Sequence, residues 1–109
     1  MAMPYFEAPA EASRRLTPAD LVSACYEKDV RNVLFDEGAL PPEFFDLSSG
    51  FAGEMVQKLV NYGIRAAVVV RDVTGYSKPF RDFVLESNRS GPMRFFQDRE
   101  SAIAWLSNS

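Results

Sequence analysis

The chain has 109 residues, of which 47% are hydrophobic and 25% are charged, and its net charge is -3. This length suits one domain with a single core, and the balance of residues excludes wholesale disorder. A mildly acidic chain without a dense Lys or Arg run has no electrostatic footprint for nucleic acid or for an anionic membrane, so we expect neither partner.

Two further features limit the catalytic chemistry that is possible and indicate the cellular compartment. Histidine is absent, which excludes Ser-His and Cys-His catalytic pairs and His-bearing zinc sites, and we expect no metal and no cofactor. Cys25 is the only cysteine and cannot form an internal disulfide, in agreement with a reducing compartment. The apolar run at residues 64–70 is too short to span a bilayer, and no signal-peptide pattern opens the chain. We therefore expect a cytoplasmic protein.

The first predicted elements are an arm and a helix. Residues 1–15 are rich in Ala, Glu and Pro and are expected to form a loosely ordered arm with one edge strand around residues 4–7. The single domain is expected at residues 16–109. It begins with a helix that Thr17 caps and in which Cys25 lies on the buried stripe as a small hydrophobe.

The middle of the chain alternates between strand and helix. A short apolar strand is predicted at residues 32–35, and a β-branched strand at residues 64–70 has the composition of a central strand. Between them, a helix is predicted from about residue 49 to residue 62, and Gly63 ends it. Its apolar stripe is expected to consist of Ala52, Met55, Val56, Leu59 and Val60.

The last third of the chain continues this alternation. Ser77-Lys78-Pro79 begins a helix, residues 93–96 form a strand, and Asp98 caps a final helix. The predicted fold is α/β, a small sandwich with a four to five stranded, mostly parallel sheet and about four helices. Right-handed crossovers bring the carboxyl ends of parallel strands to one edge, where open α/β sheets bind ligands.

One arrangement of residues resembles a known fold. A strand that ends at Asp36 is followed by a hydrophobic loop and by the run Phe45-Asp46-Leu47-Ser48-Ser49-Gly50 at a helix start. This resembles the STAS fold of sulfate transporters and anti-sigma-factor antagonists, which carry an Asp-Ser-Ser-Gly element there. Residues 95–106 resemble the ending of the SpoIIAA-like subgroup. Leu47 separates the acid from the serines, unlike in the antagonists.

A second set of positions carries a closer resemblance. They are Phe44-Phe45-Asp46-Leu47, Ser49-Gly50, Ala52-Gly53-Glu54, Gln57-Lys58, Asn61-Tyr62, Asp82-Phe83 and Glu86-Ser87-Asn88-Arg89. This pattern resembles a bacterial family of domains of unknown function, the one numbered 4180, and the resemblance implies no established activity. Arg71 stands where that family often has glycine, so a long cation replaces open space.

We expect a functional site at the strand-end edge, with the segment from Asp46 to Glu54 as one wall. The main hypothesis is a non-enzymatic, STAS-like regulatory or binding module that binds a protein partner or a small ligand there. Gln57 and Asn61 are otherwise explained as part of a solvated helix face. The residues assigned to the site are Asp36, Asp46, Ser48, Ser49, Gly50, Gly53, Glu54, Gln57, Asn61, Asp72, Asn88 and Arg89.

The two serines have three interpretations. As N-cap residues, Ser48 and Ser49 would satisfy free amides of the first helical turn. As phosphorylation sites, they would change the surface that a partner meets. With Gly50 and Gly53, they would instead form a cradle for an anion or a small ligand. The glycines have an alternative explanation, which is close packing of the helix on the sheet.

The competing hypothesis is a small cofactor-free enzyme of the isomerase, cyclase or hydratase type. Asp46 or Glu54 would act as general acid or base, Arg71 would hold an anion, and Tyr62 or Tyr76 would donate a proton. A concave cavity around these carboxylates would favour catalysis, whereas a flat edge would favour docking.

The oligomeric state stays open in the sequence. A homodimer would use exposed aromatic residues, and we expect Tyr5, Phe6 and Phe44 to be among them.

Overall fold

The structure is a computed structural model, and it describes residues 4–9 and 17–107. Short 3-10 turns lie in the loops at residues 37–50 and 70–77. The remainder of the predicted arm lies outside the described residues. The elements are β1 (Phe6–Glu7), α1 (Pro18–Lys28), β2 (Asn32–Asp36), α2 (Phe51–Tyr62), β3 (Arg65–Val69), α3 (Lys78–Ser90), β4 (Met93–Phe96) and α4 (Arg99–Ser107).

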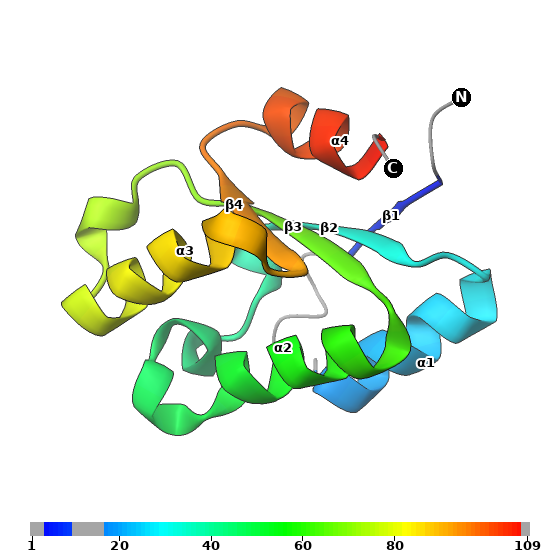
Figure 1. The fold of residues 1–109 in the computed structure, drawn as a ribbon, viewed down its shortest axis with the longest axis horizontal. Helices are drawn as coiled ribbons and strands as arrows, with labels where there is room; N and C mark the ends of the chain where they lie inside the picture. The colour runs from blue at the N-terminus through cyan, green and yellow to red at the C-terminus, as the bar shows by residue number, and fades with distance from the viewer. Residues whose placement is uncertain (1–3, 10–16, 108–109) are drawn as a thin grey trace.

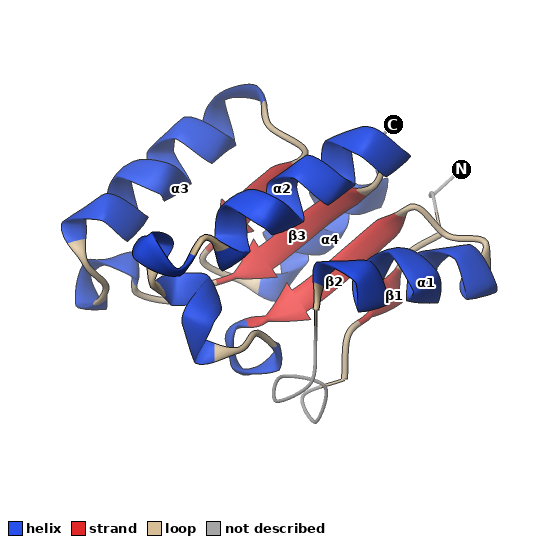
Figure 2. Cartoon of the chain, turned by 90° about the horizontal axis from the view of Figure 1, so that it is seen from below, coloured by secondary structure: helices blue, strands red, loops and turns tan. Residues whose placement is uncertain are grey.

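The four strands form one parallel sheet in the order β1-β2-β3-β4. This confirms the α/β class, the parallel sheet and the four helices. Because consecutive strands are neighbours, three successive crossovers of one hand place α1, α2 and α3 on the same face. Figure 1 and Figure 2 show these helices on one side of the sheet and α4 on the other.

The core consists of two layers that the sheet separates. Along β2, Val33 and Phe35 face the three-helix layer while Leu34 faces α4, as the two-residue period of a strand requires. The larger layer includes Leu21, Cys25, Val33, Phe35, Met55, Leu59, Ala66, Val68, Phe80 and Met93. The smaller layer consists of Leu34, Ala67, Val69, Ala102 and Leu106, all with no exposed surface. The prediction that residues 64–70 form a strand covered on both faces is confirmed.

The predicted helix ends are confirmed at several positions. The Thr17 hydroxyl accepts the Asp20 amide at 3.1 Å and the Asp20 carboxylate accepts the Thr17 amide at 3.2 Å, which is a complete capping box. Asp98 accepts the Ser101 amide at 2.8 Å at the start of α4. Gly63 ends α2 with φ 65°, a left-handed conformation that glycine adopts without steric cost.

The predicted edge strand near the amino terminus is also present, as β1. It pairs with β2 through Phe6 and Glu7, and the buried Asn32 side chain donates to the Pro4 carbonyl at 3.0 Å. A bidentate pair between Arg99 and Glu7, at 2.7 and 2.9 Å, connects β1 to α4. These contacts attach β1 to the body of the domain.

Two burial predictions are wrong. Val60 is 62% exposed, because it lies on the flank of the α2 stripe whose centre is formed by Ala52, Met55 and Leu59. Phe44 has no exposed surface and packs among other aromatic rings, so it is not available to a homodimer. In the part of the chain that the structure describes, no helix combines the length and apolarity needed to cross a membrane.

Candidate functional site

The candidate site lies where β2 and β3 end and α2 begins. Three predicted acids lie in the loops of this edge, and each accepts the backbone amide two residues later at the start of a 3-10 turn. These pairs are Asp36 with Gly38 at 3.4 Å, Asp46 with Ser48 at 3.1 Å and Asp72 with Thr74 at 3.0 Å. Hydrogen bonds from the hydroxyl and the amide of Thr74 lower the pKa of Asp72. The acids therefore order the loops of the edge.

The start of α2 differs from the prediction. The helix begins at Phe51, and Gly50 is its N-cap, with φ 81° and no side-chain cap hydrogen bond. Ser48 and Ser49 lie in the preceding 3-10 turn, so neither serine is the N-cap, and only Ser49 accepts an amide of the first helical turn. The physical reason is that the chain enters α2 through a left-handed residue, which favours glycine over serine.

Both serine hydroxyls nevertheless hold this turn together. Ser48 Oγ donates to Asp46 Oδ1 at 2.6 Å. Ser49 Oγ donates to the Glu43 carbonyl at 2.7 Å and accepts the Phe51 amide at 3.1 Å. Ser49 thus satisfies one amide of the first turn of α2, although it lies one residue before the N-cap, Gly50. The segment at residues 46–50 is exposed but internally hydrogen-bonded.

Aromatic side chains fill the space behind the edge. The Phe44 ring contacts the rings of Phe45, Phe51 and Phe80 with centroid distances of 5.2 to 6.5 Å. Phe45 stacks on Tyr76 at 4.7 Å with an interplanar angle of 10°. Aromatic pairs of this geometry add to the energy of burial. The region where open α/β sheets often have a ligand crevice is packed here.

Besides the stacking of Phe45 on Tyr76, two polar contacts connect the loop after β2 to the loop after β3. The Tyr76 hydroxyl donates to the Glu37 carboxylate, and burial together with this acceptor raises the pKa of Tyr76. Arg71 lies 3.7 Å from Asp36, with both side chains well exposed. Arg71 and Tyr76, which the enzymatic hypothesis uses as anion clamp and proton donor, therefore have partners inside the edge.

The polar side of α2 extends away from this edge. Glu54, Gln57 and Asn61 are exposed along it. A Cβ atom added at Gly53 would meet nothing within 4 Å, and the same holds at Gly50. Close packing on the sheet therefore does not account for either glycine.

Other predicted residues lie apart from the edge. The amide of Asn88 bonds to the backbone of Phe95 on β4, and Arg89 is exposed near the end of α3. Tyr62 is at the far end of α2, about 16 Å from its start at 1.5 Å per residue, and cannot join a site at Asp46. Within the described ranges, 4–9 and 17–107, no three His, Cys, Asp or Glu side chains converge as metal ligands.

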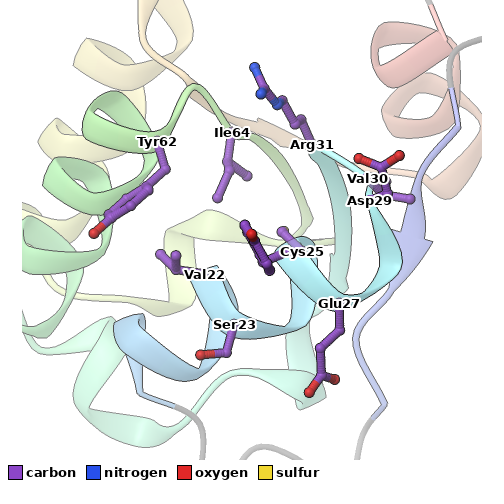
Figure 3. Close-up of a pocket in the computed structure, with 10 residues that line it drawn as sticks. Val22, Ser23, Cys25, Glu27, Asp29, Val30, Arg31, Tyr62 and Ile64 are labelled. Carbon is purple, nitrogen blue, oxygen red and sulfur yellow. The ribbon is translucent and has the colours of Figure 1, made fainter.

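A groove that the sequence analysis did not identify lies at the opposite edge, at the amino ends of β2 and β3. Its volume is about 860 Å³. Figure 3 shows it between the end of α2, which carries Tyr62, and the carboxyl half of α1. The only signal in the sequence is a tyrosine near the end of each helix, at Tyr26 and Tyr62.

Comparison with known proteins identifies the family. Residues 10–106 match the family described as Domain of unknown function (DUF4180), and the chain belongs to it. This confirms the resemblance to the family numbered 4180. No curated protein and no solved structure matches the chain.

Proposed function

We propose that this DUF4180 domain is a non-enzymatic, STAS-like regulatory module that binds a protein partner through its strand-end surface. We define this surface as the turn at residues 46–50, the first turn of α2 and the loop at residues 71–76. A protein partner is favoured over a small ligand because the surface is exposed and backed by packed aromatic rings.

The observation that carries the proposal is Gly53. Glycine inside a helix costs about 1 kcal/mol relative to alanine, and the helix here has open space at the Cβ position. Its φ is not in the left-handed region, so neither the backbone nor the packing of the isolated domain requires glycine. Close approach of a partner's backbone to α2 would account for it.

The placement of the carboxylates supports docking rather than catalysis. Asp46 and Glu54 are both exposed, and Asp46 accepts two hydrogen bonds from Ser48. A general acid or base works in a water-poor pocket that also holds the substrate. Phe44, Phe45 and the other rings occupy the space in which such a pocket would lie.

The STAS-like and regulatory parts of the proposal depend on the turn before α2. β2 ends at Asp36, and α2 follows the Ser48-Ser49-Gly50 turn, as the resemblance implies. Ser48 is exposed and its hydroxyl lies 2.6 Å from Asp46. A phosphate on Ser48 would place two anionic groups side by side, so modification would open the turn and change the docking surface.

The experiment compares three immobilised forms of the full chain in an extract of the native host. These are the wild type, Gly53→Arg and the matched control Ala104→Arg, which adds the same side chain at an exposed position of α4 on the other face of the sheet. Quantitative mass spectrometry should find a protein that the wild type and the control retain and that Gly53→Arg loses. Identical sets of proteins on all three forms would refute the proposal.

A second step tests the contact with purified components. The protein so identified is titrated with the wild type and with Gly53→Ala. The alanine should weaken binding while leaving the domain folded, because it fills the space that the partner's backbone needs. Equal affinity would argue against close approach at this position.

A further inference from the structure

We propose that the groove at the amino ends of β2 and β3 is the interface through which two copies of this chain form a twofold-symmetric dimer. We call it the α1–α2 groove. It lies at the edge of the sheet opposite to the proposed docking surface, so the two proposals stand on different residues.

The floor of the α1–α2 groove is apolar. Val22, Cys25 and Ile64 line it, and Figure 3 shows Ile64 pointing into its middle. Cys25 and Ile64 are only 4% and 3% exposed. Cys25 and Ile64 therefore add little further burial. The apolar surface that a partner would cover belongs to the half-buried Val22 and to the rings of Tyr26 and Tyr62, and covering it is favourable at about 25 cal/mol per Å².

Two tyrosines with large exposed areas line the same groove. Tyr26 is 88% exposed and Tyr62 is 53% exposed. Tyrosine is enriched at the energetic centres of protein interfaces because it supplies a large apolar ring and a polar tip at low entropic cost. A groove of about 860 Å³ has room for the Tyr26 ring of a second copy.

The charges on the rim favour a second copy of this chain over a partner whose surface carries charges of one sign only. The rim carries the acids Glu27 and Asp29 together with Arg31. None of the three appears among the ion pairs of the described residues, which are Arg71–Asp36, Lys78–Asp82 and Arg99–Glu7. An interface between identical copies must be self-complementary, and a rim of mixed sign meets that requirement.

The positions of these charges agree with twofold symmetry. In Figure 3, Arg31 points away from one end of the groove and Glu27 from the other. A twofold axis through the groove therefore brings Arg31 of each copy toward Glu27 of the other. Such a dimer leaves both strand-end surfaces facing outward, so it would present two docking surfaces to a partner.

Sedimentation velocity of the full chain over a concentration series tests the proposal. We expect the wild type to form a dimer that weakens as salt is added. Tyr26→Ser should raise the dissociation constant about 30-fold, as expected for a central interface residue. Because Tyr26 is almost fully exposed, circular dichroism should show an unchanged fold. A wild type that stays monomeric throughout, or a Tyr26→Ser variant that dimerises as tightly as the wild type, would overturn the proposal.

Charge reversal tests the symmetry itself. Glu27→Arg and Arg31→Glu should each weaken the dimer about tenfold, since each places like charges opposite one another. The double variant should regain most of the affinity because the pair re-forms with its signs exchanged. The control Glu86→Arg, on the exposed side of α3, should dimerise as the wild type does. A double variant weaker than either single variant would refute the twofold pairing.

Discussion

The side-chain amide of Asn88 pairs with both backbone polar groups of Phe95. Its Oδ1 accepts the Phe95 amide at 2.8 Å and its Nδ2 donates to the Phe95 carbonyl at 3.4 Å. β4 is an edge strand, and the carbonyls of Pro92 and Phe96 accept the amides of Ala66 in β3 and of Val70 directly after it. Alternate residues of a parallel strand direct their polar groups to opposite sides, so Phe95 directs its own to the free edge. The Asn88 side chain therefore satisfies the two backbone groups of Phe95 with which another strand could otherwise pair.

Asn88→Ala should therefore destabilise the domain and expose its edge. We expect a loss of about 1 to 3 kcal/mol in the free energy of unfolding, because the Phe95 amide and carbonyl lose a partner in a partly buried place. Urea unfolding measures this loss, and light scattering should report faster aggregation. Arg89→Ala is the matched control, one residue further along the exposed surface of α3. Equal stability of the two variants would contradict this role of Asn88.

Ser48→Glu should loosen the turn before α2. The introduced carboxylate would lie beside Asp46, which the Ser48 hydroxyl now approaches to 2.6 Å, so repulsion between two carboxylates replaces a hydrogen bond. Hydrogen exchange of residues 46–54 should become faster, while exchange in β3 stays the same.

The double variant Ser48→Glu with Asp46→Asn removes the repulsion and should restore part of the protection. Slow exchange in the single variant would show that the turn tolerates the added charge, and would count against regulation by modification of Ser48.

Most of the fold could be predicted from the sequence because the signals for its helices and strands are local. Thr17, Gly63 and Asp98 end or begin helices through contacts within a few residues, and the strand at residues 64–70 follows from β-branched composition alone. The order of strand and helix then constrains the topology, since parallel neighbours require crossovers of one hand.

The errors occurred where a residue's environment depends on distant parts of the chain. Phe44 lies in a proline-rich loop whose sequence has no periodicity. It is buried because the tertiary fold packs Phe80 and Phe95 against it, which the local sequence does not indicate. In the sequence, Asn88 has the character of a polar surface residue. Its contact with Phe95 forms only because the fold places β4 next to α3. Tyr26 and Tyr62 meet at one groove only because α1 and α2 pack side by side.

Gly53→Ala should stabilise the isolated domain. Alanine is compatible with the helical backbone, and its methyl group meets nothing within 4 Å, so the unfolded chain loses freedom without strain in the folded state. We expect a gain of about 0.4 to 1 kcal/mol in the free energy of unfolding. Thermal or urea unfolding measures it. Gly50→Ala is the opposite control, since φ is 81° there and the same substitution should destabilise. A loss at Gly53 would mean that α2 needs glycine for its own fold.

Cys25 should react slowly with thiol reagents while the protein is folded. Cys25 lies on the buried side of α1, in the larger core layer, and burial raises the pKa of its thiol to about 11. Since only the thiolate reacts, the rate at pH 8 should be at least about 100-fold lower than in the unfolded chain. A chromogenic disulfide reagent with and without urea measures the ratio. Similar rates would show that the α1–α2 groove leaves the sulfur accessible.

Tyr76 should make the stability of the domain fall at alkaline pH. Burial and the Glu37 carboxylate raise the pKa of Tyr76 above its ordinary value, so the neutral hydroxyl is favoured in the folded state. The contribution is fully present below the unfolded value of about 10. It decreases as the pH rises above that value, because the unfolded chain then releases a proton that the folded chain retains.

Tyr76→Phe separates this contribution from the stacking on Phe45. The variant keeps the ring and loses the hydrogen bond, so at pH 7 it should be about 1 kcal/mol less stable than the wild type. Urea unfolding from pH 8 to pH 11.5 should show the difference between the two proteins shrinking as Tyr76 begins to ionise in the unfolded wild type. A difference that stays constant over this range would mean that the Tyr76 proton does not contribute to the stability of the folded domain.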